Sequence, residues 1–194
     1  MARHIVIIQG HPDARGHHFG HALAEAYRQG AAEAGHEVKT IAVAQLDFPL
    51  LRAQQDFSGS EPPEAIRDAQ QMISWAEHLV IVYPLWIGTM PALLKAFFEQ
   101  VMRPGFAFTE SEGKWPRKLL QGRSARVIIT MGMPAFIFRW YYRAHSLKSL
   151  ERNILGFCGI GPIKETLIGM VESEKAGNHQ KWLERMQALG RAGK

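Results

Sequence analysis

The chain has 194 residues, of which 46% are hydrophobic and 21% charged. This balance is typical of one ordered globular domain, here taken to span 1–194. The formal net charge of +5 is too diffuse to indicate a nucleic-acid partner, because the chain contains no block of consecutive Lys or Arg and no nucleic-acid-binding motif. The single cysteine, Cys158, excludes an intrachain disulfide and a metal site built from several cysteines.

Two further absences bear on location. No apolar run approaches the roughly 20 residues needed to span a bilayer. The chain also enters a strand within a few residues of Met1, without a charged-then-apolar leader. We therefore expect a cytoplasmic protein.

Predicted strands and helices alternate along the chain. Residues 4–10 favour a buried strand, 22–34 a helix closed by Gly35, and 37–42 a second strand, which together form a βαβ unit. A long loop is expected over 47–63, because Gly59, Pro62 and Pro63 interrupt regular structure. Further strands are expected over 79–83, 124–131 and 163–171, and further helices over 64–77, 91–103, 146–155 and 173–189. Five strands alternating with helices favour an α/β, doubly wound parallel sheet.

The loop after the first strand, residues 11–20, has the composition of a phosphate site. A helix N-terminus presents free N–H groups to an anion, and His11, Arg15, His17 and His18 precede the expected helix. Neither a GxGxxG nor a Walker A sequence is present, so a nicotinamide Rossmann site and a P-loop are not indicated. Two other interpretations remain open. His17 and His21, four residues apart, fit one helical face and a metal ion, or these histidines are simply solvated.

Residues 79–108 carry the most informative pattern. A short apolar run ends at Pro84, the loop 85–89 contains Trp86 and Gly88, and Pro91 suits the first turn of a helix. In an open α/β sheet, ligands bind beyond the carboxyl ends of the strands, so Trp86 is placed to touch a flat ligand. The alternative is a buried strand and helix with a surface tryptophan.

The same stretch, YPLWIGTMPALLKAFFEQV followed by GFAF, resembles the segment shared by the flavodoxin-like NAD(P)H:quinone oxidoreductases. That family includes DT-diaphorase and the flavoprotein ancillary subunits of potassium-efflux systems. The resemblance implies the flavodoxin-like strand order 2-1-3-4-5 and a flavin at the carboxyl edge of the sheet. It implies cofactor-binding roles for residues in the loops after the first, third and fourth strands: His11, His17, His18 and Phe19; Pro84, Leu85, Trp86, Ile87 and Gly88; and Thr130, Met131 and Gly132.

The resemblance also implies catalytic candidates in the aromatic segment 136–145. In the family a Tyr and a His after this strand lie over the flavin, which makes Tyr141 or Tyr142, with His145, the candidates here. The alternative is that these aromatic side chains fill a core or a subunit interface.

The function implied is a flavin-dependent NAD(P)H:quinone oxidoreductase with ping-pong hydride transfer. The expected cofactor is FAD, with FMN as the alternative, and NAD(P)H is the co-substrate. The expected partners are a quinone and a second copy in a homodimer. Two alternative functions are a regulatory subunit of a potassium-efflux transporter and an azo- or nitro-compound reductase.

Overall fold

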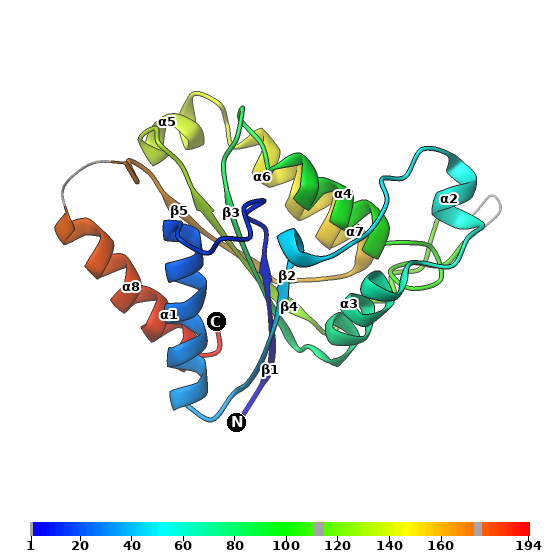
Figure 1. Cartoon of the computed structure of the whole chain (residues 1–194), viewed down its shortest axis with the longest axis horizontal. Coiled ribbons are helices and arrows are strands. Elements are labelled where there is room, and N and C mark those ends of the chain that lie inside the picture. The colour runs from blue at the N-terminus through cyan, green and yellow to red at the C-terminus, as the bar shows by residue number, and fades with distance from the viewer. Residues whose placement is uncertain (1, 111–114, 173–175) are drawn as a thin grey trace.

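A five-stranded parallel sheet in the order β2-β1-β3-β4-β5 forms the centre of the molecule (Figure 1). The structure is a computed structural model and describes residues 2–110, 115–172 and 176–194. The order confirms the doubly wound sheet expected from the sequence. The strands are β1 (His4–Gln9), β2 (Glu37–Ala42), β3 (His78–Pro84), β4 (Ser124–Thr130) and β5 (Ile163–Ile168).

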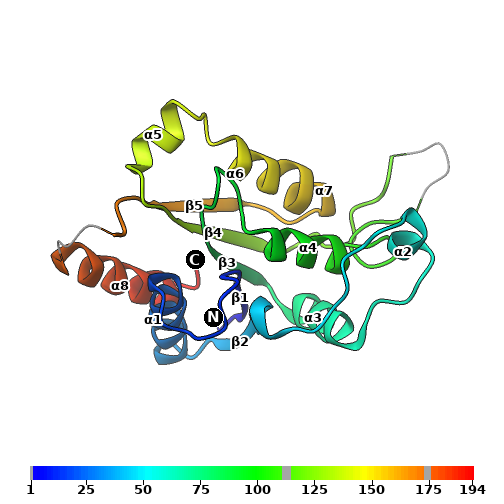
Figure 2. The ribbon, with the colours of Figure 1, turned by 45° about the horizontal axis from the view of Figure 1, so that its top comes forward.

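Helices cover both faces of this sheet (Figure 2). One face carries α1 (Phe19–Glu33) and α8 (Ala176–Arg191). The other carries α3 (Glu64–Trp75), α4 (Ala92–Val101) and a continuous run of α6 (His145–Ser149), a π-helical stretch (Leu150–Leu155) and α7 (Gly156–Cys158). Shorter elements lie in the connections: a 3₁₀ turn (Val43–Gln45), α2 (Gln54–Ser58) and α5 (Ala135–Trp140). Among the described residues no helix is long and apolar enough to cross a membrane.

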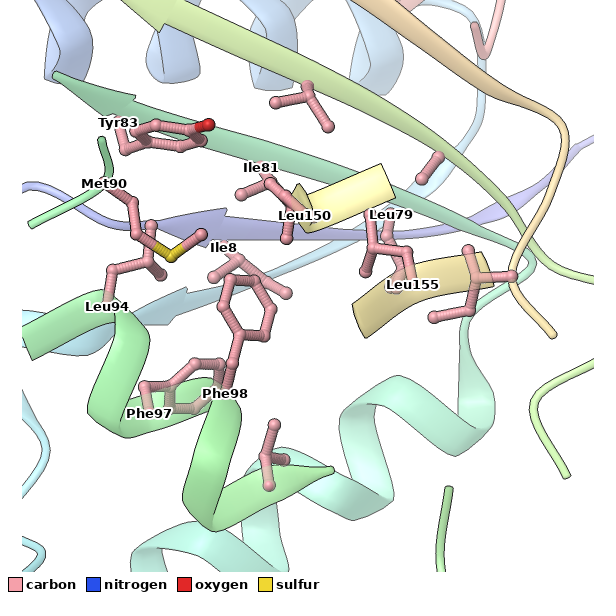
Figure 3. Close-up of a cluster of buried hydrophobic side chains, with 14 of the residues drawn as sticks. Ile8, Leu79, Ile81, Tyr83, Met90, Leu94, Phe97, Phe98, Leu150 and Leu155 are labelled. Atoms are coloured by element: carbon pink, nitrogen blue, oxygen red, sulfur yellow. The ribbon is translucent and has the colours of Figure 1, made fainter. Parts of the chain in front are cut away.

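The central strands are buried on both faces, as their unbroken apolar runs predict. Alternate residues point in opposite directions, so Ile7 and Val82 pack against α1 and α8. Ile8, Leu79 and Ile81 pack on the other face against Leu94, Phe97 and Phe98 of α4 and Leu150 and Leu155 of the π-helical stretch (Figure 3). The sheet is therefore a rigid platform that positions the loops at the amino and carboxyl ends of its strands.

Helices α1 and α8 approach each other through glycine. A Cβ at Gly30 of α1 would lie 2.1 Å from the carbonyl oxygen of Gln187, and one at Gly190 of α8 would lie 2.1 Å from that of Tyr27. Only a residue without a side chain fits at these two positions.

Helices α3 and α4 each end two residues before the predicted boundary, at Trp75 and Val101. Two other helix boundaries differ from the sequence-based expectation for a visible structural reason. Helix α1 begins at Phe19 rather than at residue 22, because Gln9 donates a hydrogen bond to the carbonyl of Gly20 and holds the first turn. The helix predicted over 146–155 does not end at Gly156. A Cβ there would lie 2.7 Å from the carbonyl of Glu151, so the wide π-helical turn needs this glycine, and the chain reverses only at Gly159 with φ +100°.

Smaller differences are found at three other places. The predicted loop 47–63 contains α2, and β5 ends at Ile168 rather than at residue 171. The first residues of the last predicted helix, 173–175, lie outside the described residues.

Candidate functional site

The loops that carry the predicted site residues meet at the carboxyl edge of the sheet. In the parallel register Gln9 of β1 is paired with Val82 of β3, and Pro84 at the end of β3 is paired with Thr130 at the end of β4. The N–H of Gly10 also donates to the carbonyl of Val82 at 2.7 Å. The loops after β1, β3 and β4 therefore leave the sheet side by side, at the crevice where open α/β sheets bind ligands.

Asp13 organises the loop between β1 and α1. Its carboxylate accepts hydrogen bonds from Nε of Arg15 at 2.9 Å and Nη2 of Arg15 at 2.7 Å, and it lies 2.9 Å from Nε2 of His18. The Arg15 hydrogen bond, followed by that of His18, holds the pKa of Asp13 well below its ordinary value. The loop is thus a cross-linked polar turn, and the Arg15 side chain stays largely exposed.

His11 is a neutral hydrogen-bond donor in this loop. Its Nδ1 accepts a hydrogen bond from the N–H of Asp13 at 3.1 Å, which places the proton of the neutral ring on Nε2. Burial, and then the charges of His18 and His21, lower the pKa of His11. The His11 ring also stacks on that of His18, with 3.9 Å between centroids.

The first turn of α1 offers backbone donors. The N-cap residue, His18, makes no side-chain capping bond, although its carbonyl accepts from the N–H groups of His21 and Ala22. Within the described part of the chain, the N–H groups of Phe19 and Gly20 have no hydrogen-bond acceptor. Free N–H groups at a helix N-terminus are a binding site for an anionic group.

The side chains around this turn have distinct roles. Gln9 donates Nε2 to the carbonyl of Gly20 and accepts from the N–H of His11, both at 3.1 Å. The Phe19 ring stacks on His179 of α8, with 4.3 Å between centroids, so the Phe19 side chain joins two helices. Sequence reasoning missed Gln9 and Asp13; the signal for Gln9 was a lone glutamine at the end of an apolar strand.

The histidines of this loop are gathered but not arranged as a metal site. Among the described residues, no group of three or more His, Cys, Asp or Glu side chains could hold a metal ion. His17 is exposed, and within the same residues it makes no hydrogen bond. His21 lies beside His11, with 5.2 Å between ring centroids.

The β3–α4 loop is a tight turn with outward N–H groups. The N–H and carbonyl of Trp86 pair with those of Thr89 at 2.8 and 3.0 Å. Both central residues have positive φ, +46° at Ile87 and +77° at Gly88, as in a type I′ turn. Ile87 is fully exposed and Trp86 is half exposed. In the part of the chain that the structure describes, the N–H groups of Ile87 and Gly88 find no acceptor.

Pro84 and Leu85 anchor this turn to the sheet. Pro84 is the last residue of β3, and the N–H of Leu85 donates to the carbonyl of Thr130 at 2.8 Å. The rings of His11 and Trp86 are nearly perpendicular, with 6.1 Å between centroids. The turn is therefore fixed to β4 and lies next to the β1–α1 loop.

The residues of the β4–α5 loop are more buried and more fully hydrogen-bonded than the sequence analysis expected. Thr130 and Met131 are buried. The N–H of Met131 donates to the carbonyl of Ile168 at 2.9 Å, and its carbonyl accepts from Val171, so the Met131 main chain is not free for a ligand. Gly132 is the exposed position of this loop.

The three catalytic candidates lie at different places in the crevice. Tyr141 and Tyr142 are exposed and contact each other edge to face, with 5.0 Å between ring centroids. His145 is the first residue of α6. A largely apolar cavity of about 440 Å³ joins Trp86, Ile87 and the first turns of α4 to Ser146 and Ser149 of α6, and neither tyrosine lines it.

Comparison with known proteins shows which family and which relatives this chain resembles. A family model described as the flavodoxin-like fold matches residues 3–189. A Haemophilus influenzae protein named as an NAD(P)H oxidoreductase is 29% identical over 168 residues, which cover 84% of this chain and 82% of that protein. A Bacillus anthracis protein named FMN-dependent NADH:quinone oxidoreductase 3 is 26% identical over 175 residues, covering 80% and 82%.

A solved structure shares the fold over nearly its full length. The NAD(P)H:quinone oxidoreductase from Methanothermobacter marburgensis has a TM-score of 0.80 at 23% identity, covering 98% of this chain and 96% of that one. Three longer relatives also match, and the chain spans 57% of the length of each.

Proposed function

Because the chain belongs to the family of proteins with a flavodoxin-like fold, we propose that it is a flavin-dependent NAD(P)H:quinone oxidoreductase. The observation that carries the proposal is a pair of backbone donor sets on neighbouring loops. One lies at the first turn of α1, and the other lies in the turn formed by Trp86 to Thr89. A flavin has a phosphate at one end and a ring with carbonyl and nitrogen acceptors at the other, and the two sets match these ends.

The phosphate end suits the β1–α1 loop. The N–H groups of Phe19 and Gly20 lack acceptors within the described residues, and His11 carries a neutral Nε2–H. Arg15 adds positive charge and His18 adds a ring nitrogen, although Asp13 contacts both of them. Charge-assisted hydrogen bonds of this kind are the strong ones.

The ring end suits the β3–α4 turn. The N–H groups of Ile87 and Gly88 point away from any acceptor in the described chain, and the rigid turn fixes their direction. The adjoining cavity is lined mostly by apolar atoms, which suits a flat aromatic ring. On the other side, Gly132 is the position at which the β4–α5 loop is open to a ligand.

We propose FMN as the cofactor. The sequence analysis gave FAD as the expected cofactor and FMN as the alternative. The support is the Bacillus anthracis relative named as FMN-dependent, because the match covers 82% of the length of that protein. NAD(P)H is the proposed co-substrate, in line with the name of the Haemophilus influenzae relative.

The bound flavin would supply two-electron hydride chemistry between NAD(P)H and a quinone, in two successive half-reactions. The residues of this chain bind and orient. The α1 turn would hold the phosphate, the Ile87 and Gly88 N–H groups would bind the polar edge of the ring, and Trp86 would contact the ring. Tyr141 or Tyr142, together with His145, would help to stabilise charge on the reduced ring, which is the role that the resemblance implies for a Tyr and a His after β4.

A homodimer is part of this proposal. The cavity beside Trp86 is continued between α4 and α7 by a second one of about 200 Å³, and Lys95 and Ile154 line both. Phe157 and Phe108 add apolar surface to the second cavity. A second copy seated on this groove would cover it and exclude water from the ring, as hydride transfer requires. The cytoplasmic location expected from the sequence stays a prediction.

Initial-rate kinetics tests the proposal. NADH or NADPH and a water-soluble quinone are varied together, with the protein loaded with FMN. Parallel double-reciprocal lines are expected, because the first product leaves before the quinone binds. Intersecting lines would require both substrates to be bound at once and would contradict the shared site.

A further inference from the structure

A hollow of about 410 Å³ opens at the amino ends of β3, β4 and β5. This is the end of the sheet at which β1 begins, marked N in Figure 1, and it lies opposite the carboxyl edge that carries the candidate flavin site. Because the strands are parallel, the residues that begin them lie side by side there. Within the described chain, the hollow shares no lining residue with the two cavities beside Trp86.

Three cationic side chains and one carboxylate line this hollow. The cations are Arg3, Lys164 and Lys194, which are exposed and form no ion pair with a described residue. The carboxylate is that of Glu77, whose Oε2 accepts a hydrogen bond from the N–H of His4 at 2.9 Å. The side chains of the lining therefore carry an excess of positive charge.

A buried histidine in the lining has an unmet hydrogen bond. The His78 side chain is 3% exposed, and its Nδ1 lies 2.7 Å from Oγ of Ser124. Its other nitrogen, Nε2, is buried and has no hydrogen-bond partner among the described residues. When the Ser124 hydroxyl donates to Nδ1, the neutral ring carries its proton on Nε2. A buried donor without an acceptor is destabilising, so an oxygen acceptor at this place would stabilise the protein.

Cations from separate elements surround this ring. After burial, the charges of Arg3, Arg126 and Lys164 are the causes that lower the pKa of His78. These three residues come from the segment before β1, from β4 and from β5. Arg126 is itself buried, and its Nη1 donates to Oγ1 of Thr166 at 2.9 Å. A neutral donor in such a positive potential favours an anionic acceptor.

We propose that this hollow binds a phosphate group, with His78, Arg3 and Lys164 as the donors. Phosphate oxygens accept charge-assisted hydrogen bonds from Arg and Lys, and a neutral imidazole N–H adds a further bond. The charge of Glu77 opposes binding, and the cations of the lining outweigh it. The volume of about 410 Å³ exceeds that of a phosphate ion, so the group is either the free ion or part of a phosphomonoester.

A phosphate titration followed by NMR of the His78 ring tests the inference. The full chain is held at neutral pH, and sodium chloride is exchanged for sodium phosphate at constant ionic strength, so that general screening does not change. The ring protons of His78 are expected to shift saturably, with the midpoint at a low millimolar concentration of phosphate. The absence of a saturable shift at His78 overturns the proposal and leaves water as the partner of Nε2.

The β1–α1 loop is a second place at which phosphate can bind, and the ring of His11 reports on it. A shift at His11 without one at His78 would place phosphate in that loop alone and would overturn the proposal. The hollow uses no residue of the candidate flavin loops. A protein that takes up no flavin but shows the shift at His78 would therefore contradict the proposed function and support this site.

Glycerol 3-phosphate is the second probe and separates the two sources of the phosphate group. Tighter binding of glycerol 3-phosphate would identify a phosphomonoester as the occupant of the hollow. Tighter binding of inorganic phosphate would identify the free ion. Either order supports the proposal, provided that the His78 ring reports saturation.

Two charge variants should act in opposite directions. Lys164→Met removes a lining cation and is expected to weaken phosphate binding about fivefold. Glu77→Gln removes the opposing charge but keeps an oxygen acceptor for the N–H of His4, so it is expected to strengthen phosphate binding about threefold. Both side chains are exposed, so the fold should persist, which circular dichroism checks. Weaker binding in Glu77→Gln would contradict an anion in the hollow.

Lys181→Met is the matched control for Lys164→Met. Lys181 is exposed on α8 and does not line the hollow, although its loss changes the net charge by the same amount. The affinity reported by His78 should be unchanged in this variant. An equal loss of affinity in Lys164→Met and Lys181→Met would show a non-specific response to net charge and would overturn the site.

The pKa of His78 gives a readout that a distant anion would not move. Without phosphate it is lowered to about 4. A negative charge beside the ring favours the protonated form, so saturating phosphate should raise this pKa by about one unit. The same ring protons measure it in chloride and in phosphate. An identical pKa in both would place the anion away from His78 and would overturn its role as a donor.

Discussion

Trp86 and Thr89 close a turn on each other, with N–H to carbonyl distances of 2.8 and 3.0 Å in the two directions. This pairing forces Ile87 and Gly88, between them, into positive φ. For glycine the conformation costs little, but for a β-branched residue it is strained. Strain of this kind is concentrated at functional sites, and here it accompanies two outward N–H groups beside an apolar cavity.

Replacing Ile87 should relieve that strain. Ile87→Asn creates the Asn-Gly pair that type I′ turns favour. Since Ile87 is fully exposed, no packing is lost. The free energy of unfolding should rise by about 0.5–1 kcal/mol, measured by urea denaturation. A fall in stability would show that the isoleucine side chain makes a stabilising contact in solution.

The neighbouring glycine should respond in the opposite sense. A Cβ at Gly88 would meet no atom within 4 Å, yet φ is +77°. Gly88→Ala should therefore lower the free energy of unfolding by about 1 kcal/mol through the backbone alone. It should also weaken FMN binding, because relaxation of the turn redirects the N–H. Unchanged FMN affinity in a destabilised Gly88→Ala protein would argue against a ring contact at this turn.

The contact between α1 and α8 should not tolerate a methyl group at Gly30. A Cβ there would lie 2.1 Å from the carbonyl of Gln187, and backbone must move to admit it. Gly30→Ala should cost about 3 kcal/mol or more, although alanine is the better helix former. Thermal unfolding measures this.

A control on the same helix separates packing from propensity. Ala32 is exposed, so Ala32→Gly should cost only about 1 kcal/mol, through propensity. A Gly30→Ala protein that is as stable as the parent would mean that the two helices are not in close contact in solution.

His78 should make the fold sensitive to acid. Burial, followed by the charges of Arg3, Arg126 and Lys164, lowers the pKa of His78 to about 4. The unfolded chain takes up this proton near pH 6.5 and the folded chain only near pH 4. Stability is therefore fully present above about pH 6.5 and is lost as pH falls toward 4, by roughly 3 kcal/mol from this group.

An NMR titration of the His78 ring protons gives its pKa directly, and His78→Gln should flatten the pH dependence of unfolding between pH 6.5 and 4. The ring Nδ1 lies 2.7 Å from Oγ of Ser124, and glutamine retains a polar partner for it. A His78 that titrates near 6.5 would contradict the buried, neutral state.

The β1–α1 loop should favour a flavin that carries a phosphate over one that lacks it. The apoprotein should bind FMN roughly 100-fold more tightly than riboflavin, which lacks the phosphate. Asp13→Asn removes the group that cross-links Arg15 and His18, so it should reduce this ratio about tenfold while leaving riboflavin binding unchanged. Quenching of flavin fluorescence measures both affinities. If the ratio instead rises in Asp13→Asn, the carboxylate acts mainly by repelling the phosphate.

The alternation of strands with helices and the positions of the three loops were predictable because they depend on hydrophobic patterning. The apolar runs ending at Gln9, Pro84 and Thr130 are long enough to mark buried parallel strands, and their carboxyl ends must share an edge. The order of the strands, by contrast, was predicted from the resemblance of the segment after β3 to the flavodoxin-like family rather than from periodicity. The structure confirms that order.

The details of the site were not predictable from the pattern, because they depend on tertiary hydrogen bonds. Gly20 reads as a helix breaker, and only its bond from Gln9 shows why α1 begins earlier. An isoleucine gives no signal for a left-handed turn, so the geometry at Ile87 follows from the pairing around it. The resemblance implied that Met131 binds the cofactor, but its N–H donates to the carbonyl of Ile168 in β5.

The visible absorbance spectrum of the purified protein, with chromatography of the cofactor released on denaturation, tests the central claim most directly. The account predicts a yellow protein that releases FMN. Release of FAD would correct the cofactor and keep the flavin site. A colourless protein that also takes up neither FMN nor FAD when either is supplied would contradict the account.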